Sequence, residues 1–93
     1  MNYAWDENKL TLNLKNHKVH FIMAERFEWE SALVEADQRK DYGEPRFRAY
    51  GVIDDRLYCL IFTPRDGDTR IISLRKANRR EVNDYVSKTD TAH

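Results

Sequence analysis

The chain has 93 residues, of which 41% are apolar and 34% charged, and its sixteen basic side chains balance sixteen acidic ones. This length suits a single domain, which we place at 1–93 with 88–93 as a flexible tail, and an aromatic content of 12% excludes a disordered chain. No apolar run could span a bilayer, and the N-terminus has no charged start before an apolar core. We therefore expect a cytoplasmic protein with no membrane contact.

The cysteine and histidine residues give little sign of special chemistry. Cys59 is alone, so it cannot form an internal disulfide, and its apolar neighbours predict a buried small side chain. His17, His20 and His93 do not have the spacing of metal ligands. We expect no metal and no cofactor.

The N-terminal third predicts helices. Residues 3–5 form a short extended start, and Asp6 is a good N-cap for a helix that runs to about His17. A second short helix is predicted over 21–29, where Phe21 and later residues recur at helical spacing.

From residue 31 onward the pattern changes to alternation, which is typical of strands. Four strands are predicted, at 32–36, 46–53, 57–63 and 69–75, with tight turns between the last three. The result is an α+β domain with two N-terminal helices, an antiparallel meander of about four strands and one C-terminal helix.

The C-terminal helix is expected to begin after Asn78. Glu81 stands where a capping box needs its second member. Val82, Tyr85 and Val86 are predicted to form the buried stripe of this helix.

The strand alternation also predicts a polar face of the sheet. If Phe47 and Ala49 face the core, their neighbours on the same strand face outward, and Ile72 and Leu74 set the faces of the last strand in the same way. We therefore expect one open face to carry Arg46, Arg48, Tyr50, Ser73 and Arg75.

The zero net charge argues against a nucleic-acid-binding protein, but the charge is unevenly distributed. Between Arg70 and Arg80 there are five basic residues and no acidic one. Such a local patch can bind phosphates, and it can equally be an ordinary solvated face.

Cleavage of RNA without a metal needs a base, cations that stabilise charge on phosphorus, and an acid. Arginine suits the second task, because its planar fork matches two phosphate oxygens. The candidates for proton transfer are His17, Glu44, Tyr50 and Tyr85, and none of them is diagnostic by itself.

Several ordered motifs extend through nearly the whole chain, from residue 3 to about 86. They are Trp5-Asp6-Glu7-Asn8-Lys9, Asn13-Leu14-Lys15-Asn16-His17, Asp37-Gln38-Arg39, Tyr42-Gly43-Glu44-Pro45-Arg46, and Arg70-Ile71-Ile72-Ser73-Leu74-Arg75-Lys76-Ala77 with Glu81 and Tyr85 beyond it. Together they resemble BrnT-type toxins. One departure is Asn16-His17-Lys18, where that family usually has Lys-His-Gly, so no glycine is present to end the helix in the left-handed conformation.

The resemblance implies a RelE-like fold and a metal-independent endoribonuclease that inhibits translation and growth. It also implies a BrnA-like antitoxin that neutralises the toxin. Operator DNA would be bound only through this antitoxin. On this basis the catalytic residues would be His17, Glu44, Arg46, Arg70 and Arg75. The RNA contacts would come from Lys76, Arg79, Arg80 and Tyr85.

A second hypothesis is a catalytically inactive toxin-like module that only binds a partner protein. The lack of an obvious base, the neutral charge and aromatic residues expected at the surface, such as Trp5 and Trp29, favour it. A purely structural subunit is a third hypothesis, which no particular residue supports.

Overall fold

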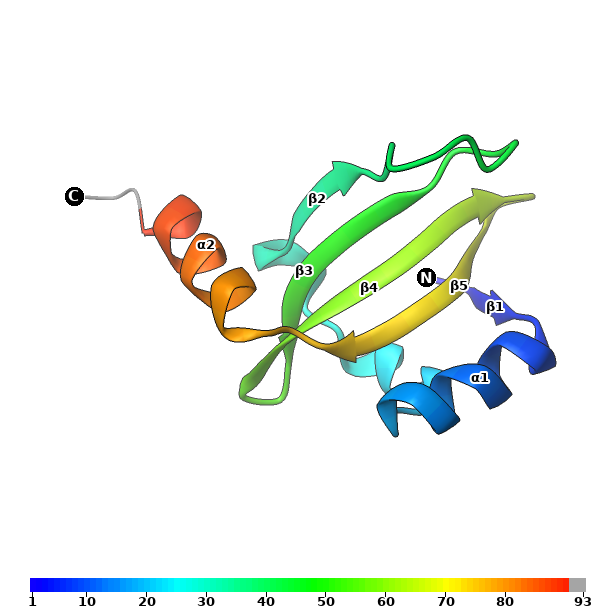
Figure 1. Cartoon of the computed structure of the whole chain (residues 1–93), viewed down its shortest axis with the longest axis horizontal. Coiled ribbons are helices and arrows are strands. Elements are labelled where there is room, and N and C mark those ends of the chain that lie inside the picture. The colour runs from blue at the N-terminus through cyan, green and yellow to red at the C-terminus, as the bar shows by residue number, and fades with distance from the viewer. Residues whose placement is uncertain (91–93) are drawn as a thin grey trace.

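A five-stranded mixed sheet forms the centre of the molecule in the computed structural model, which describes residues 1–90 (Figure 1). The elements in chain order are β1 (Tyr3–Trp5), α1 (Glu7–His17), the 3₁₀ turns η1 (Phe21–Arg26) and η2 (Trp29–Ser31), β2 (Leu33–Ala36), β3 (Phe47–Ile53), β4 (Arg56–Arg65), β5 (Asp68–Lys76) and α2 (Arg79–Thr89). Residues 88 and 89 of the expected tail belong to α2, and 91–93 lie outside the described residues. Within the described part of the chain, no helix is long and apolar enough to cross a membrane.

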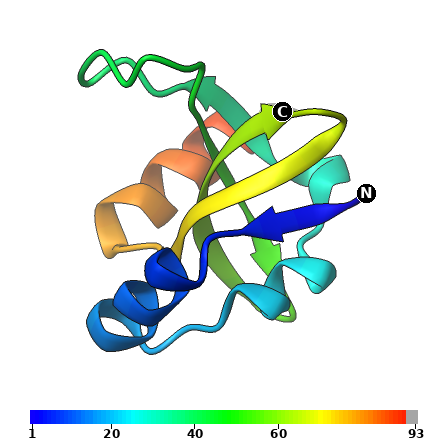
Figure 2. The ribbon, with the colours of Figure 1, turned by 90° about the vertical axis from the view of Figure 1, so that its right-hand side faces the viewer.

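The α+β class agrees with the sequence prediction, but the predicted four-stranded antiparallel meander is wrong. The strand order is β1-β5-β4-β3-β2, and β2 to β5 pair antiparallel with their neighbours. The extended start, Tyr3–Trp5, adds a fifth strand that runs parallel to β5 and pairs Ala4 with Arg70 (Figure 2). A three-residue segment is too short to show an alternation, so this pairing could not be predicted from the residue pattern.

The predicted second N-terminal helix is also wrong, because residues 21–29 contain the 3₁₀ turn η1, two extended residues and only the first residue of η2. Phe21, Ala24 and Phe27 are all buried, and their spacing of three matches the three residues per turn of a 3₁₀-helix. Phe27 itself is extended and forms an isolated bridge to Ile53. The apolar period of this segment is therefore 3.0 and not 3.6.

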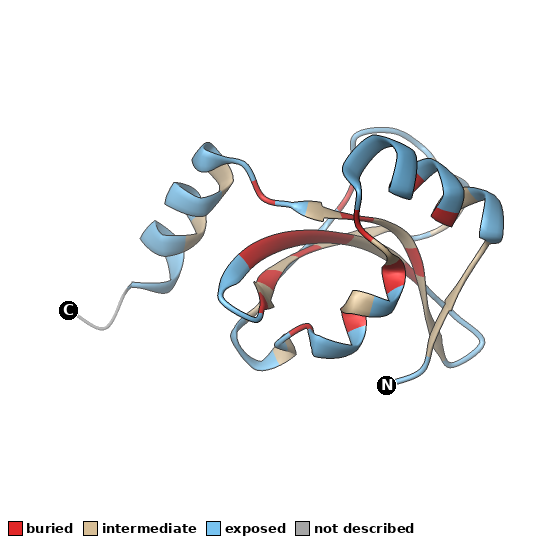
Figure 3. Ribbon diagram, turned by 90° about the horizontal axis from the view of Figure 1, so that it is seen from below, coloured by how far each residue is buried: buried red, intermediate tan, exposed pale blue. Residues whose placement is uncertain are grey.

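One face of the sheet packs against α1 and η1, and this layer is the core (Figure 3). Phe21 from η1 is fully buried there, beside Leu60 and Ile71 of the sheet. Phe27 lies directly over Gly51, where a Cβ atom would come within 3.0 Å of three ring carbons. Gly51 is thus needed for the close approach of this ring to the strand.

The aromatic residues expected at the surface are packed against this core. Trp5 makes edge contacts with Phe21 and His20, and Trp29 makes them with Phe27 and Phe62. Both tryptophans are partly buried. They give no support to a partner-binding module.

Helix α1 is attached to the edge of β5 by one buried amide. Asn13 accepts a hydrogen bond from the backbone N–H of Leu74 at 3.1 Å and donates to the Leu74 carbonyl at 2.8 Å. It also donates to the carbonyl of Val19, which follows the helix. Strand β1 ends before this point, so the Asn13 side chain provides the hydrogen bonds that a neighbouring strand would otherwise give to the Leu74 backbone.

Helix α1 begins and ends at the residues that the sequence predicts. Asp6 caps the helix by accepting from the backbone N–H of Asn8, as predicted. At the other end Lys18 adopts the left-handed conformation, with φ of 61°, although it is not a glycine. His17 is therefore the last helical residue, as expected.

The prediction that Ile72 faces the core is wrong, because β5 contains an irregularity. The register between β4 and β5 shifts at Ile61 and Phe62, which pair with Ser73 and Ile71 and leave Ile72 as an extra residue. Ile71 and Leu74 are consequently the buried residues of this strand. Beyond the extra residue, the alternation continues with Leu74 facing the core. Ser73 and Arg75 therefore still lie on the opposite face, as predicted.

Helix α2 begins with the predicted capping box between Asn78 and Glu81. Its predicted buried stripe is wrong, since none of the described residues 79–89 is buried. Val82 and Val86 keep 36% and 51% of their surface exposed. Figures 1 and 3 show α2 extending away from the sheet instead of covering it.

Candidate functional site

The second face of the sheet carries the polar residues that alternation predicted. Arg48 pairs with Ile61, which pairs with Ser73, and in the next row Tyr50 pairs with Cys59, which pairs with Arg75. These two rows confirm that Arg48, Tyr50, Ser73 and Arg75 share one face. Cys59 is fully buried, as predicted, and it is the small residue between Tyr50 and Arg75.

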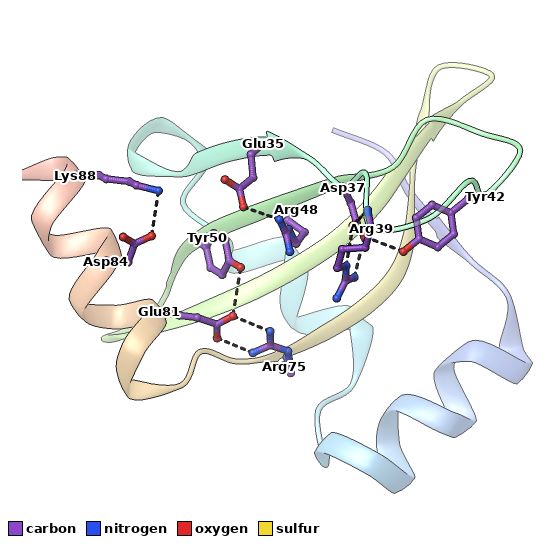
Figure 4. A network of polar contacts seen from close by, with 10 residues as sticks. All are labelled: Glu35, Asp37, Arg39, Tyr42, Arg48, Tyr50, Arg75, Glu81, Asp84 and Lys88. Carbon is purple, nitrogen blue, oxygen red and sulfur yellow. Dashed lines mark hydrogen bonds and ion pairs between the residues drawn. The ribbon is translucent and has the colours of Figure 1, made fainter.

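The strongest polar contact on this face joins Arg75 to Glu81. Both terminal nitrogens of the Arg75 guanidinium donate to the two Glu81 carboxylate oxygens, each at 2.8 Å. The Tyr50 hydroxyl donates to the same carboxylate at 3.2 Å (Figure 4). Only 29% of the Arg75 side chain and 15% of the Glu81 side chain are exposed, so this pair is partly shielded from water.

The electrostatics of this group follow from its geometry. The hydrogen-bonded Arg75 guanidinium lowers the pKa of Glu81 to about 2 and in return raises the pKa of Arg75. Burial, followed by the nearby Cys59 and Glu81, raises the pKa of the Tyr50 hydroxyl, so it remains a hydrogen-bond donor at neutral pH. At this site a cationic donor, Arg75, and a neutral donor, Tyr50, converge on the Glu81 carboxylate.

The shifted pKa of Glu81 predicts an acid-sensitive fold. Because the folded pKa, about 2, lies below the ordinary value of 4.5, the charged pair stabilises the fold above pH 4.5. That contribution is lost as the pH falls toward the folded pKa. We expect the urea midpoint of unfolding to fall over this range, and to fall less in Glu81→Gln, which cannot titrate. If the urea midpoint fell equally with pH in both proteins, the charged pair of Arg75 and Glu81 would not contribute to the stability of the fold.

Arg48 forms a second ion pair on the same face. Its guanidinium contacts the Glu35 carboxylate at 2.9 Å, from a position opposite Glu35 in the register of β2 and β3. The Nε of Arg48 is buried without a hydrogen-bond partner in the structure. Glu35 therefore neutralises this cation without using all its donors.

Glu44 and Arg46 lie at the other end of β3, in the loop before it. Arg46 donates to Glu44 at 3.2 Å and stacks over the Tyr42 ring at 4.1 Å. Arg65 also contacts Glu44, at 3.4 Å. Arg46 lies four residues before Tyr50, about 13 Å along the strand, so this group is separate from the Arg75 pair.

The same loop is held by Asp37, which sequence analysis did not single out beyond its motif. Its side chain has no exposed surface and accepts two hydrogen bonds from Arg39 at 2.8 Å, and Tyr42 donates to it at 3.4 Å (Figure 4). The hydrogen bonds from Arg39 lower the Asp37 pKa to about 2. Asp37 and Arg39 thus organise the loop that carries Glu44 and Arg46.

The remaining predicted catalytic residues lie apart from Arg75. His17 is exposed at the end of α1 and lines a shallow pocket with Ser73 and Asn13 at the edge of β5. Arg70 pairs with Thr63 in the sheet, five residues from Arg75. The structure places the predicted catalytic residues at four positions, namely Arg75, the Glu44–Arg46 pair, Arg70 and His17, and not around one point.

The predicted RNA contacts lie where β5 leads into α2. Lys76 ends β5, and Arg79 and Arg80 open α2, all three exposed. Tyr85 lies further along α2, and its hydroxyl donates to the Ser31 carbonyl at 2.8 Å. Its role in attaching α2 to the body of the protein was not expected from the sequence.

A comparison with known families places the chain in one of them. Residues 5–81 match the model of a family described as the ribonuclease toxin, BrnT, of type II toxin–antitoxin systems. The chain belongs to the BrnT family. A search among curated proteins found no match.

Membership of the BrnT family implies ribonuclease toxin activity and an antitoxin partner. The match ends at Glu81, so it includes all of β5 and the contact between Arg75 and Glu81 but little of α2. Sequence analysis missed Glu81 as a site residue, because the capping box already explained it. No spacing signal shows that the turn between β5 and α2 brings Glu81 back to Arg75.

Proposed function

We propose that this BrnT-family chain is an endoribonuclease that needs no metal and cuts RNA by attack of a ribose 2′-hydroxyl on the adjacent phosphorus. The attack forms a 2′,3′-cyclic phosphate, breaks the bond to the 5′-oxygen, and leaves that oxygen as a hydroxyl once it is protonated. The observation that supports this is the convergence of Arg75 and Tyr50 on a single carboxylate of the open sheet face, since the same donors suit the anionic oxygens of a phosphate.

Arg75 is the residue that would stabilise the charge on the phosphorus. A guanidinium that already binds both oxygens of a carboxylate has the geometry to bind two phosphate oxygens. Arg46 and Arg70 would bind the RNA backbone further along the face, with Lys76, Arg79 and Arg80 on the α2 side.

The better candidate for proton transfer is His17. It lies one helical turn after Asn13, beside Ser73 at the edge of β5, and an imidazole ring can both accept and donate a proton. The Glu44 carboxylate is instead held by two arginines, Arg46 and Arg65. We therefore propose Glu44 as a residue that orients Arg46.

We also propose that a BrnA-like antitoxin neutralises the toxin by covering this face, and that operator DNA is bound only by the antitoxin. The pairing of Arg75 with Glu81 and of Arg48 with Glu35 favours the alternative, a module that only binds its partner, since both cations already have counter-ions. A direct measurement of RNA cleavage separates these two functions.

The test is inducible expression of the chain alone, with growth and the chemistry of new RNA ends measured together. We expect rapid arrest and new fragments with 5′-hydroxyl and cyclic phosphate ends. Fragments with 5′-phosphate ends would contradict attack by the 2′-hydroxyl. Intact RNA in cells that contain soluble protein would favour the partner-binding alternative.

A further inference from the structure

Glu81 accepts hydrogen bonds as a bound phosphate would. Its two oxygens receive both terminal nitrogens of Arg75 at 2.8 Å and the Tyr50 hydroxyl at 3.2 Å. The same planar fork binds carboxylates and phosphates, because the spacing of the two oxygens is similar. While Glu81 is in place, the donors of Arg75 that point into the site are already used.

The helix that carries Glu81 has few other attachments to the body of the protein. None of the described residues of α2 is buried, and the apolar Val82 and Val86 remain substantially exposed (Figure 3). Beyond the contacts of Glu81, the hydrogen bond from Tyr85 to the Ser31 carbonyl joins α2 to the rest of the fold. Moving this helix therefore uncovers no fully buried side chain of α2 itself, which is typical of segments that open at low free-energy cost.

An anion can reach the site from solvent. A broad open hollow lies between α2 and β3, and its lining includes Arg48, Tyr50, Arg80 and Glu81. Its charged lining consists of two cations, Arg48 and Arg80, and three carboxylates, those of Glu35, Glu81 and Asp84, so Arg80 is the cation there that is not paired with Glu35. A ligand in the hollow would meet the Glu81 carboxylate before it could contact the Arg75 fork.

We propose that the Glu81 carboxylate occupies the phosphate-binding site formed by Arg75 and Tyr50, and that an RNA phosphate binds there by displacing Glu81 and with it helix α2. The identity of the anion as an RNA phosphate rests on the proposed function. Glu81 is then an internal competitor, and the apparent affinity of the site for phosphate is reduced by the fraction of molecules in which Glu81 is bound.

The test is a titration of the full chain and of Glu81→Gln with inorganic phosphate. NMR signals of the Arg75 side chain report the binding and give the affinity of each protein. Glutamine keeps the size of the residue and its oxygen can still accept from the Asn78 N–H, so the capping box is preserved. It loses the charged contact with Arg75. We expect phosphate to bind at least about tenfold more tightly to this variant, which corresponds to 1.4 kcal/mol.

Asp84→Asn is the matched control. It removes the same charge from the next turn of α2, where Asp84 contacts Lys88 at 3.0 Å and not an arginine of the site. We expect its phosphate affinity to rise much less than that of Glu81→Gln. Equal increases in both variants would overturn the proposal, because the effect would then be one of net charge.

A second measurement does not depend on any substitution. Hydrogen exchange of the α2 backbone amides in the unaltered chain should become faster as phosphate is added, because displaced α2 loses its attachment. Unchanged exchange at saturating phosphate would overturn the proposal. Tighter phosphate binding by Glu81→Gln with no RNA cleavage by either protein would instead refute only the ribonuclease function, and cleavage without any gain in phosphate affinity would refute only the displacement.

Discussion

Replacement of Arg75 with Ala is expected to abolish RNA cleavage and growth arrest while the sheet stays folded. The substitution removes both donors that converge on the anion site, and the loss of such donors typically lowers a rate by about 100-fold or more. Cleavage should be measured as the rate of appearance of cyclic phosphate ends after induction. The fold should be checked by circular dichroism and by the urea midpoint of the purified variant.

Three further variants separate chemistry from structure in this result. Arg75→Lys keeps the charge without the fork, so we expect it to retain only a small part of the activity. Arg26→Ala removes an exposed arginine that pairs with Asp54, and it should cleave RNA normally. Glu81→Gln removes the ion pair but keeps the Arg75 guanidinium, so it shows the effect of losing the ion pair alone. A folded Arg75→Ala that still cleaves RNA would exclude Arg75 from the site.

Replacement of Asn13 with Ala is expected to destabilise the fold strongly. The buried Asn13 amide binds both the N–H and the C=O of Leu74 and the carbonyl of Val19. Without it, buried backbone groups at the edge of β5 lose their partners. We expect the free energy of unfolding to fall by about 2–4 kcal/mol, which is measured by urea unfolding.

Two related variants make the Asn13 prediction specific. Asn13→Asp keeps an acceptor for the Leu74 N–H but places a carboxylate against two carbonyl oxygens, so it should also be strongly destabilising. Asn16→Ala removes an exposed asparagine from the same helix, and such surface changes stay within about 0.5 kcal/mol. Similar losses for Asn13→Ala and Asn16→Ala would show that the amide does not hold the edge of β5.

Patterns that depend on neighbouring residues predicted much of the fold. The cap of α1 at Asp6, the long strands β3 and β4, and the capping box at Asn78 all follow from local chemistry. The parallel strand β1 could not be predicted, because its partner lies more than sixty residues away and its three residues carry no pattern. The exposure of α2 was also missed, since its apolar spacing is that of a buried helix and only the tertiary structure shows that nothing covers it.

The candidate site was predictable to the extent that it depends on strand alternation. Arg48, Tyr50 and Arg75 were assigned to one face, and the register of the strands places them there. The position of Arg75 on that face came from an incorrect premise, because Ile72 is the extra residue of an irregular strand. Glu81 was missed because its contact with Arg75 depends on the path of the chain after β5.

The pairing of β1 with β5 has a consequence for how the toxin is made. The first strand of the sheet pairs with residues 69–71, so it has no partner until most of the chain has left the ribosome. Contacts between such distant segments form late and slow the folding of the domain. Arg75 follows that pairing by a few residues on the same strand, so the contact between Arg75 and Glu81 forms only after all five strands have been synthesised. The sheet is therefore completed only after the strand that carries Arg75 has been synthesised.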